Sequence, residues 1–449
     1  MKVGIIGAGL AGLAAGLDLA DRGHEVELLE RRPWAGGATY SFLDNETGEE
    51  IDNGQHLFME CTTAYRSFLE RLGTLNLAFR QDRLRVSVFD QNGNRSDLWA
   101  SNLPFGMHLA PTLFRYHHLS WRQKLEILRA FLSLRQMQVY QRGRLENITF
   151  AKWLREQGQS PATIREFWDF LILPTLNCRA DQASASQAIF VLEEGFQKDP
   201  QSAALAVPTV GLSKLHVDPA TRAIQKLGGK ISLRAAIERL EIEDRRVTGV
   251  VLASNERRTF DAYVSTLAPW RLLPLLPEKL QEEEPFSQLK AFEPASILNL
   301  HLWFDRPVAD FNFGAFIHSE VQWVFNRTRL AGKNENQRQH LVISISAPDD
   351  LFTLNQEQIC NRVLPQLQQA LPTAQEATLL RYRVIKEPEA TFLPTPGLRR
   401  PNPRTPIQNL FLAGAYTATG WPATMESAVR SGIAAAAAAA AAAVETNRT

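Results

Sequence analysis

Residues 1–37 decide the fold, and they read MKVGIIGAGLAGLAAGLDLADRGHEVELLERRPWAGG. A short apolar run leads into Gly7-Ala8-Gly9-Leu10-Ala11-Gly12. An alanine- and leucine-rich helical pattern then continues to Arg22, and a second apolar run ends at Glu30. A GxGxxG turn between a strand and a helix, with an acidic residue closing the next strand, is the context of a dinucleotide-binding fingerprint. We therefore predict a βαβ unit that binds a nucleotide.

Each glycine of this turn has a physical role. Gly7 permits the tight turn out of the strand, Gly9 lets backbone N–H groups approach a pyrophosphate, and Gly12 lets the helix pack against the sheet. The helix N-terminus adds free N–H donors and a partial positive charge. Glu30 lies where a carboxylate can accept hydrogen bonds from both ribose hydroxyls. An ordinary buried βαβ unit would leave the three glycines unexplained.

Length and composition narrow the class of protein. A chain of 449 residues is long for one core, so we expect two domains. The formal net charge of +1 gives no strong field, and we expect no nucleic-acid partner. Cys61, Cys178 and Cys360 show no metal-binding or disulfide spacing, which fits a reducing, cytoplasmic location. The ten alanines at 434–443 are too short to cross a bilayer, and we expect a solvent-edge extension of the final helix.

The pattern along the chain indicates that it leaves the nucleotide-binding domain and returns to it twice. We assign residues 1–74, 205–270 and 396–449 to that domain, and residues 75–204 and 271–395 to a second, substrate-binding domain. Apolar residues at helical spacing predict helices, and Asp244-Arg245-Arg246 predicts a hairpin turn. The principal elements expected are helices at 65–72, 119–139 and 212–227, a hairpin of strands at 231–242 and 247–252, strands at 262–266, 297–304, 378–385 and 410–414, and a helix from about 423.

Three further segments carry a resemblance. They are EIDNGQHL at 50–57, PTLN at 174–177 and GWPATMESAVRSG at 420–432. With the GxGxxG turn and Gly36-Gly37, they resemble the FAD-dependent amine oxidase and carotene desaturase superfamily, and within it the hydroxysqualene dehydroxylases. The likeness extends from Met1 to about Ala434. It implies FAD as cofactor and an α/β fold, with a Rossmann-type FAD-binding domain of the GR2-like flavoproteins and a discontinuous α+β substrate domain.

The resemblance also implies a role for each matching residue. For the adenosine and pyrophosphate half of FAD, the implied residues are Gly7, Gly9 and Gly12 (pyrophosphate), Glu30 and Arg31 (ribose side), and Ile237 (adenine, through its backbone). For the ribityl and flavin half, they are Gly36, Gly37, Gly414 and Ala415 (phosphate and ribityl path), and Thr424 and Met425 (flavin N1–O2 edge). A helix N-terminus at that edge would stabilise the negative charge of reduced flavin.

The sequence departs from the family at two positions. The family usually has Arg after the Gly-Gly pair, where this chain has Ala38, and Asp after the C-terminal glycine, where it has Ala415. A charge-assisted hydrogen bond contributes on the order of 1.5–3 kcal/mol, so the two losses imply weaker FAD binding. This departure favours a second interpretation, a non-catalytic prenyl-lipid carrier on the same fold, as in the Rab GDP-dissociation inhibitors.

The implied reaction is the reductive dehydroxylation of hydroxysqualene, a C30 isoprenoid, to squalene. Hydroxide leaves poorly, so the site needs an acid beside the flavin and an apolar pocket that excludes water. Asp52 and His56 are the candidate catalytic pair; the alternative is that both are satisfied structural residues. Gln55, Asn177 and Trp421 are the candidate substrate contacts, with loop capping and core packing as alternatives for the last two.

Two further alternatives concern substrate and location. A carotene (phytoene or ζ-carotene) desaturase would run hydride transfer in the opposite sense on a similar polyprenoid, with no need for an acid. The stretch from about Leu103 to Val139 combines apolar residues with Arg115, Arg122, Lys124 and Arg129. It is compatible with peripheral contact with the inner face of a membrane, and equally with a helix whose basic face is solvated.

Overall fold

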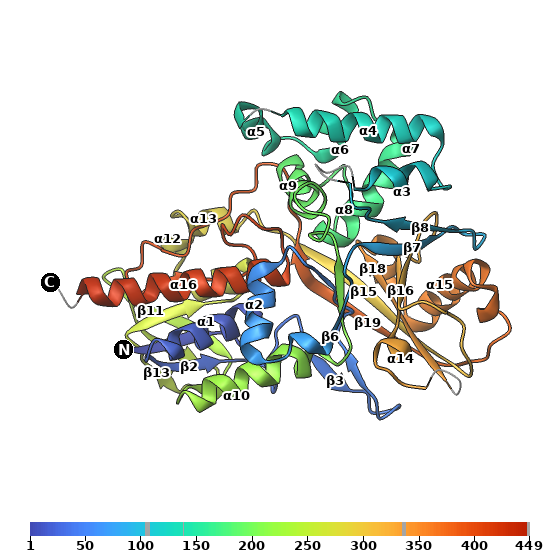
Figure 1. Ribbon diagram of the computed structural model, residues 1–449. Helices are drawn as coiled ribbons and strands as arrows, with labels where there is room; N and C mark the ends of the chain where they lie inside the picture. The colour runs from blue at the N-terminus through green and yellow to red at the C-terminus, as the bar shows by residue number, and fades with distance from the viewer. Residues whose placement is uncertain (104–107, 138, 335–337, 447–449) are drawn as a thin grey trace.

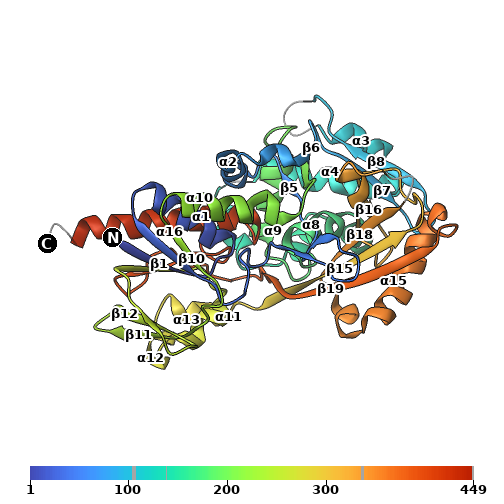
Figure 2. The ribbon, with the colours of Figure 1, turned by 90° about the horizontal axis from the view of Figure 1, so that it is seen from below.

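The computed structural model describes residues 1–103, 108–137, 139–334 and 338–446. A parallel sheet with its helices forms one end of the molecule, and a larger sheet forms the other (Figure 1). A group of helices lies above the larger sheet in this view. The long strands β15 (Pro294–Phe304) and β19 (Leu379–Phe392) run side by side through the larger part (Figure 2).

The smaller part is built on a five-stranded parallel sheet of order β10-β2-β1-β14-β20. Its central strands are almost completely buried, because helices cover one face and the strands and short helices of residues 237–289 cover the other. Three segments far apart in the chain thus meet in one sheet. The elements are β1 (Lys2–Ile6), α1 (Leu10–Asp21), β2 (Glu25–Leu29), α2 (Thr63–Leu72), α10 (Asp218–Lys226), β10 (Lys230–Ser232), β14 (Ala262–Ser265), β20 (Leu410–Leu412) and α16 (Met425–Thr446).

The alanine tail extends the final helix as expected, but only one side of it faces solvent, because the other side is buried. Helix α16 lies along α1 (Figure 1), and Ala435, Ala436 and Ala439 are buried against it. A Cβ at Gly432 would lie 2.3 Å from the Ala11 carbonyl oxygen, so the helices approach closely because their side chains are small. Among the described residues, Met425–Val444 is the one helix long and apolar enough to span a membrane. Its packing on α1 accounts for that apolar character.

The larger part is built on a seven-stranded sheet of order β19-β15-β18-β17-β16-β7-β8. On β15, Leu298, Leu300 and Leu302 face a core that includes α15, and the alternate residues face the other side. The remaining elements of this sheet are β7 (Arg85–Phe89), β8 (Arg95–Trp99), β16 (Phe313–Phe316), β17 (Trp323–Asn326), α14 (Arg327–Leu330), β18 (Gln339–Ser346) and α15 (Gln356–Ala370).

A helical cap lies on the other side, around the fully buried Trp168. Figure 1 shows α3 to α7 in its outer layer, with α8 and α9 closer to the sheets. The cap comprises α3 (Ala110–Arg115), α4 (Trp121–Gln136), α5 (Val139–Leu145), α6 (Phe150–Glu156), α7 (Pro161–Thr163), α8 (Asp169–Leu176) and α9 (Ala185–Phe196).

Small sheets connect these parts. The expected single strand at 231–242 is wrong: the chain forms β10 and then β11 (Ile237–Glu243), with Arg234 at a φ of +58° between them. Strand β10 joins the parallel sheet, while β11 pairs with β12 in the expected hairpin. The other elements are β3 (Ser41–Leu43), β4 (Glu50–Asp52), β5 (Phe58–Met59), β6 (Ala78–Arg80), β9 (Leu205–Pro208), β12 (Arg246–Leu252), β13 (Arg257–Arg258), α11 (Pro269–Leu272), α12 (Glu278–Gln281) and α13 (Phe286–Leu289).

Candidate functional site

The glycine turn has the tight geometry that its sequence predicts. Gly7 has a φ of +101°, and its backbone follows directly from β1. A Cβ at Gly12 would lie 2.1 Å from the Gly7 carbonyl oxygen, so any side chain there would push α1 away from the turn. Gly9 is the N-cap of α1, and the first N–H groups of the helix begin directly after it.

A second glycine loop lies against the first. The Gly36 N–H donates to the Ala8 carbonyl at 2.8 Å, and Gly9 and Gly36 form a parallel bridge. A Cβ at Gly37 would lie 2.8 Å from the Gly9 Cα. The Arg32 guanidinium, which sequence analysis did not single out, donates to the Gly37 carbonyl at 2.9 Å. Only glycines at 36 and 37 allow the two loops to approach this closely.

Glu30 joins these loops to the second strand. Its carboxylate is buried and accepts hydrogen bonds from the Ala8 N–H at 3.0 Å and the Arg32 N–H at 2.9 Å. Ala235, two residues before Ile237, donates its N–H to the Glu30 carbonyl at 2.8 Å, which places the start of β11 beside this strand end. The Arg31 side chain is exposed. The ribose and adenine roles of Glu30, Arg31 and Ile237 stay predictions.

The C-terminal segment completes the same edge of the sheet. Gly414 follows β20 with a φ of +130°, and its N–H donates to Ser431 Oγ at 2.8 Å. Arg400 donates to the Ala415 carbonyl at 2.5 Å and to the Trp421 carbonyl at 2.5 Å. Burial lowers the pKa of Arg400 to about 10, so it stays charged near neutral pH. Arg400, a half-buried arginine that the sequence did not single out, therefore fixes the backbone around Ala415.

Helix α16 begins where the sequence predicts. Thr424 Oγ1 accepts from the Ser427 N–H at 3.3 Å and caps the helix, and Met425 is its first residue. The next residue, Glu426, is buried and accepts from the N–H groups of Ala64 and Tyr65 at 3.0 and 2.7 Å. The start of α16 is thereby tied to α2, while the flavin contacts of Thr424 and Met425 stay predictions.

These segments together fit a dinucleotide cofactor. The turns at Gly7–Gly12 and Gly414 follow β1 and β20, and Thr266, after β14, lies beside both glycines. Ligands of open parallel sheets bind outside the carboxyl ends of the strands, and glycines that leave backbone N–H groups bare suit a pyrophosphate. The glycine geometry is what this chain needs to hold FAD.

A buried hydrogen-bond chain supports the second loop from behind. His216 is fully buried between Tyr65, whose hydroxyl lies 3.1 Å from Nδ1, and Thr39, whose Oγ1 lies 2.9 Å from Nε2. Thr39 Oγ1 in turn donates to the Gly36 carbonyl at 3.1 Å. Since Thr39 has donated its proton, Nε2 of His216 carries the hydrogen and Nδ1 accepts from Tyr65. The hydrogen bonds thus all run the same way, from the Tyr65 hydroxyl through His216 and Thr39 to the Gly36 carbonyl.

His216 could not be predicted from the sequence, because no local pattern distinguishes it. Burial lowers its pKa to about 3, so the ring stays neutral and the chain keeps its direction at every pH near neutrality. We expect His216→Phe to raise the dissociation constant for FAD at least tenfold, because the Gly36 loop loses its support. Flavin fluorescence titration of the apoprotein measures this constant.

The matched control for His216 is His108→Phe. His108 is also fully buried, but neither of its ring nitrogens has a hydrogen-bond partner among the described residues. We expect this control to bind FAD as the unmodified protein does. Equal FAD affinity of both variants and the unmodified protein would contradict the supporting role of His216.

Asp52 is buried at the end of β4, next to the cofactor loops. Its Oδ1 accepts from Ser41 Oγ at 2.7 Å and from the Leu212 N–H at 2.8 Å. Burial raises the pKa of Asp52, although the Arg327 guanidinium and these hydrogen bonds oppose the rise. The adjacent Asn53 donates to the Ala38 carbonyl at 3.0 Å, so this segment is fixed to the Gly-Gly loop.

His56 can accept a hydrogen bond through Nε2 but is poorly suited to donate a proton. Its Nδ1 lies 2.8 Å from the Gly54 carbonyl, which only accepts, so Nδ1 carries the hydrogen and Nε2 is left as an acceptor. Burial lowers the pKa of His56, with the Gly54 hydrogen bond and the charge of Asp52 opposing. Of the predicted pair, Asp52 is the one whose pKa is raised, which favours its acid form.

The same segment contacts the larger sheet. The Gln55 N–H donates to Asn299 Oδ1 at 3.2 Å, and the Gln55 side chain donates to the His56 carbonyl at 3.2 Å. Asn299 is fully buried on β15, and its Nδ2 has no partner among the described residues. His301, two residues further on this face, is hydrogen-bonded to His340 at 3.0 Å, and its Nε2 is also unpaired within the described part of the chain. No pattern in the sequence marks Asn299, His301 or His340.

Asn177 and Trp421 lie elsewhere and have protein partners. Asn177 ends α8 with a φ of +54°, and its amide donates to the Ser296 carbonyl at 3.1 Å and to Thr391 Oγ1 at 3.0 Å. Both of its N–H donors are thereby used, as in the capping alternative. The Trp421 ring packs edge-on against Phe190 with centroids 5.2 Å apart. Substrate contact by Gln55, Asn177 or Trp421 stays a prediction.

A cavity of about 790 Å³ opens beside this region, and its walls combine polar and apolar groups. It lies between the start of α9, α13 and the chain at 392–406, and charged residues including Glu146, Glu284 and Arg399 line it. Such walls do not suit a C30 hydrocarbon. The apolar pocket expected from the sequence is therefore not this cavity, and it stays a prediction.

The chain is similar over nearly its whole length to two curated enzymes and to a solved amine oxidase structure. It is 28% identical over 453 residues to a 15-cis-phytoene desaturase of Synechococcus elongatus, covering 96% of this chain and 94% of the relative. It is 26% identical over 433 residues to a hydroxysqualene dehydroxylase of Zymomonas mobilis, covering 95% and 96%. In fold it resembles cyclohexylamine oxidase from Brevibacterium oxydans, with a TM-score of 0.71 at 20% identity over 99% of both chains.

A family model agrees with these similarities. The model of the flavin-containing amine oxidoreductases matches residues 10–440, nearly the full length. This match and the glycine geometry together establish FAD as the cofactor and set aside the non-catalytic carrier. The chain is a FAD-dependent oxidoreductase and belongs to the flavin-containing amine oxidoreductase family, which includes the carotenoid desaturases.

Proposed function

We propose that this flavoprotein converts hydroxysqualene to squalene by reductive dehydroxylation. The observation that carries the proposal is the buried Asp52, whose raised pKa allows it to hold a proton beside the cofactor loops. The hydroxysqualene dehydroxylase of Zymomonas mobilis supports the same substrate class, at 26% identity.

The reaction explains why an acid is needed. The allylic C–O bond breaks with its electron pair on oxygen, and a proton from the acid turns the leaving hydroxide into water. Bound in its reduced form, FAD supplies the hydride that fills the empty position on carbon. In our proposal, Asp52 holds the proton, and Nε2 of His56 accepts a hydrogen bond from the substrate hydroxyl and orients it. Burial of this segment keeps bulk water from the developing cation.

Carotene desaturation is the second candidate. The 15-cis-phytoene desaturase of Synechococcus elongatus covers 96% of this chain at 28% identity and supports a C40 polyene substrate. A desaturase removes hydride from the substrate, and no hydroxyl needs to be protonated. A proton-holding Asp52 would then have no part in the chemistry, which is why we favour dehydroxylation.

Product analysis tests the two candidates directly. We expect the dithionite-reduced protein, kept anaerobic, to form squalene from hydroxysqualene, and the oxidised protein to leave phytoene unchanged. Gas chromatography of extracted lipids measures both reactions. Formation of ζ-carotene or another desaturated product, with hydroxysqualene untouched, would contradict our proposal and favour the desaturase.

We also propose that the protein acts in the cytoplasm, at the inner face of a membrane. A C30 hydrocarbon partitions into bilayers, so an enzyme that takes up such a substrate benefits from lying against one. Fractionation of cell lysates at low and high salt tests this location. Recovery in the membrane fraction at low salt is expected, and recovery only in the soluble fraction would contradict it.

A further inference from the structure

We propose that one face of the helical cap binds an anionic lipid bilayer. This surface, the α4 outer face, consists of Phe114 on α3 and of Trp121, Leu125, Leu128 and Leu132 on α4. The choice of a bilayer over a protein rests on the polyprenoid substrate proposed above. The arrangement and exposure of the side chains on α4 identify the face itself.

The apolar residues of α4 form a stripe that points away from the protein. At about 100° per residue, positions 121, 125, 128 and 132 fall within an arc of about 60°. Trp121 is 64% exposed, Leu125 61% and Leu132 48%. The opposite side of the helix, with Ile127, Ala130 and Leu134, is buried in the cap core. The helix therefore has a second apolar side that the fold leaves uncovered.

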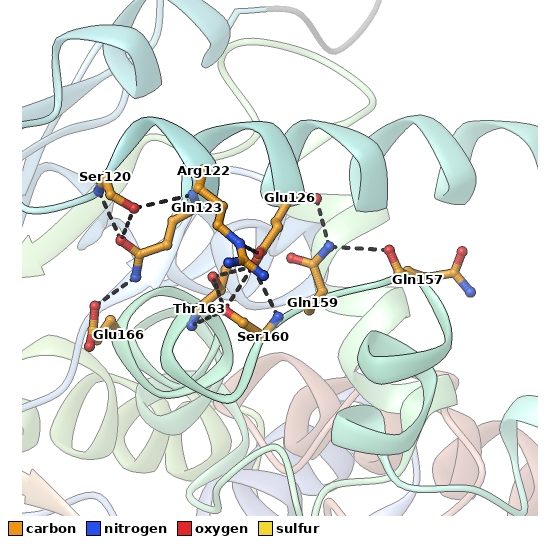
Figure 3. Close-up of polar contacts among 9 residues, drawn as sticks. All are labelled: Ser120, Arg122, Gln123, Glu126, Gln157, Gln159, Ser160, Thr163 and Glu166. Atoms are coloured by element: carbon orange, nitrogen blue, oxygen red, sulfur yellow. Dashed lines mark hydrogen bonds and ion pairs between the residues drawn. The ribbon is translucent and has the colours of Figure 1, made fainter.

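The inner edge of α4 holds this orientation firmly (Figure 3). Ser120 caps the helix with a full capping box to Gln123, and Glu126 Oε2 accepts from Ser160 Oγ and Thr163 Oγ1 at 2.8 and 2.6 Å. Burial alone would raise the pKa of Glu126, but the hydrogen bonds from Thr163 and Ser160 outweigh it and bring that pKa to about 2. An ionised, fully engaged Glu126 prevents α4 from rotating to bury its outer stripe.

Lys124 fixes the neighbouring helix to the same face. Its ammonium donates to the Phe114 carbonyl at 2.8 Å and lies 4.8 Å from the centre of the Trp121 ring. The Phe114 and Trp121 rings contact each other with centroids 5.9 Å apart, and Phe114 is 45% exposed. The two aromatic rings thus form one pre-arranged patch at the start of the stripe. Tryptophan with one apolar and one polar side is typical of membrane interfaces.

Charge supports an anionic partner. Residues 108–145 contain seven basic residues and one acidic residue, Glu126, although the whole chain has a net charge of only +1. Arg122 and Arg129 flank one side of the stripe, Arg135 flanks the other, and all three are exposed. Basic residues near an anionic membrane surface are attracted to it. The seven basic residues are Arg115, Arg122, Lys124, Arg129, Arg135, Arg142 and Arg144. Arg122, Arg142 and Arg144 form ion pairs with Glu126, Glu193 and Glu156, so the exposed Arg129 and Arg135 are the charges beside the stripe that attract an anionic surface most directly.

The size of the patch also favours a bilayer. The stripe from Trp121 to Leu132 is about 16 Å long, and the five partly exposed side chains of the α4 outer face offer on the order of a few hundred Å². A stable protein complex buries about 800 Å² on each partner. An interfacial helix requires only that its apolar side chains enter the headgroup boundary while its basic residues stay at the surface.

Co-sedimentation of the FAD-loaded protein with lipid vesicles tests the proposal. We expect binding to vesicles of phosphatidylcholine with about 30% phosphatidylglycerol, and much weaker binding to phosphatidylcholine alone. We expect Leu125→Ser/Leu132→Ser to lower the partition coefficient at least tenfold. The matched control is Leu227→Ser/Leu233→Ser, two leucines 46% and 43% exposed outside the cap, which should change it less than twofold. Flavin content and thermal midpoint verify that both variants are folded.

Two results would overturn this inference. One is sedimentation of the α4 variant with anionic vesicles equal to that of the unmodified protein. The other is failure of the unmodified protein to bind those vesicles. If the α4 variant then changes the oligomeric state measured by light scattering, the α4 outer face contacts a second copy of the protein and not a bilayer. Vesicle binding is measured without substrate. A protein that binds vesicles through α4 but leaves hydroxysqualene unchanged would thus contradict the proposed reaction and keep the membrane face.

Discussion

The Gly12→Ala protein is expected to be purified colourless, with a dissociation constant for FAD raised at least a hundredfold. The added Cβ would lie 2.1 Å from the Gly7 carbonyl oxygen, closer than any van der Waals contact allows. Helix α1 must then move away from the turn, and its first N–H groups no longer converge where the pyrophosphate lies. Absorbance at 450 nm and FAD titration of the apoprotein measure the effect.

A glycine outside the site provides the control. Gly143 lies in helix α5, and a Cβ there meets no heavy atom within 4 Å. Gly143→Ala should retain full FAD content and gain slightly in stability, because alanine restricts the unfolded chain. Circular dichroism separates loss of cofactor from loss of fold. A yellow Gly12→Ala protein with unchanged affinity would refute the role assigned to the turn.

Asp52→Asn is expected to lower turnover of hydroxysqualene per bound FAD by about 10²- to 10⁴-fold, the usual contribution of a positioned acid. Asparagine can still accept the hydrogen bonds from Ser41 and Leu212, so the loop and the FAD content should be preserved. His56→Gln should lower turnover less, because His56 orients the hydroxyl without donating the proton. Single-turnover rates at saturating substrate measure both changes.

The pH profile separates chemistry from structure. Burial raises the pKa of Asp52, and the acid form is the active one, so turnover should decrease as pH rises through this raised pKa. The Asp52→Asn protein should lack that decrease. Asp169→Asn is the matched control, since burial also raises the pKa of Asp169, which lies on α8 and accepts from the Ala180 N–H. Unmodified rates for Asp52→Asn with FAD bound would remove Asp52 from the mechanism.

The sequence predicts the nucleotide-binding part of this site because its determinants are local. A turn as tight as that at Gly7 and a contact as close as that of Gly37 with Gly9 leave glycine as the residue that fits. The start of α16 at Met425 and the strand before Gly414 follow from the same short-range signals. Such features depend on consecutive residues, so the order and spacing of amino acids are enough to identify them.

The support behind the site depends on contacts between distant segments and could not be predicted. His216 reaches Thr39 across 177 positions, and Asn299 reaches Gln55 across 244. Arg400 is separated from Ala415 by β20, which pairs with β14 in the parallel sheet. None of these residues stands out by type or spacing. Each takes its role from a burial that only the folded chain produces.

The alanine tail shows how composition alone can mislead. Ten alanines suggest a solvated helix by propensity, but the same small side chains allow α16 to approach α1 at Gly432. In the stretch at 103–139, too, the sequence pattern predicts the helix but not which of its sides is exposed. Helical spacing predicts α4 correctly, but the sequence does not reveal that Leu125 and Leu132 lie on the side opposite the core.

The most direct test of the proposed function is a single turnover followed in two ways. The protein is reduced with one equivalent of dithionite without oxygen and mixed with hydroxysqualene. Flavin absorbance and extracted squalene are then measured over time. We expect flavin reoxidation and squalene formation to proceed at one rate and in a ratio of one to one. Flavin that remains reduced while hydroxysqualene persists would contradict the claim that this protein removes the hydroxyl with a flavin hydride.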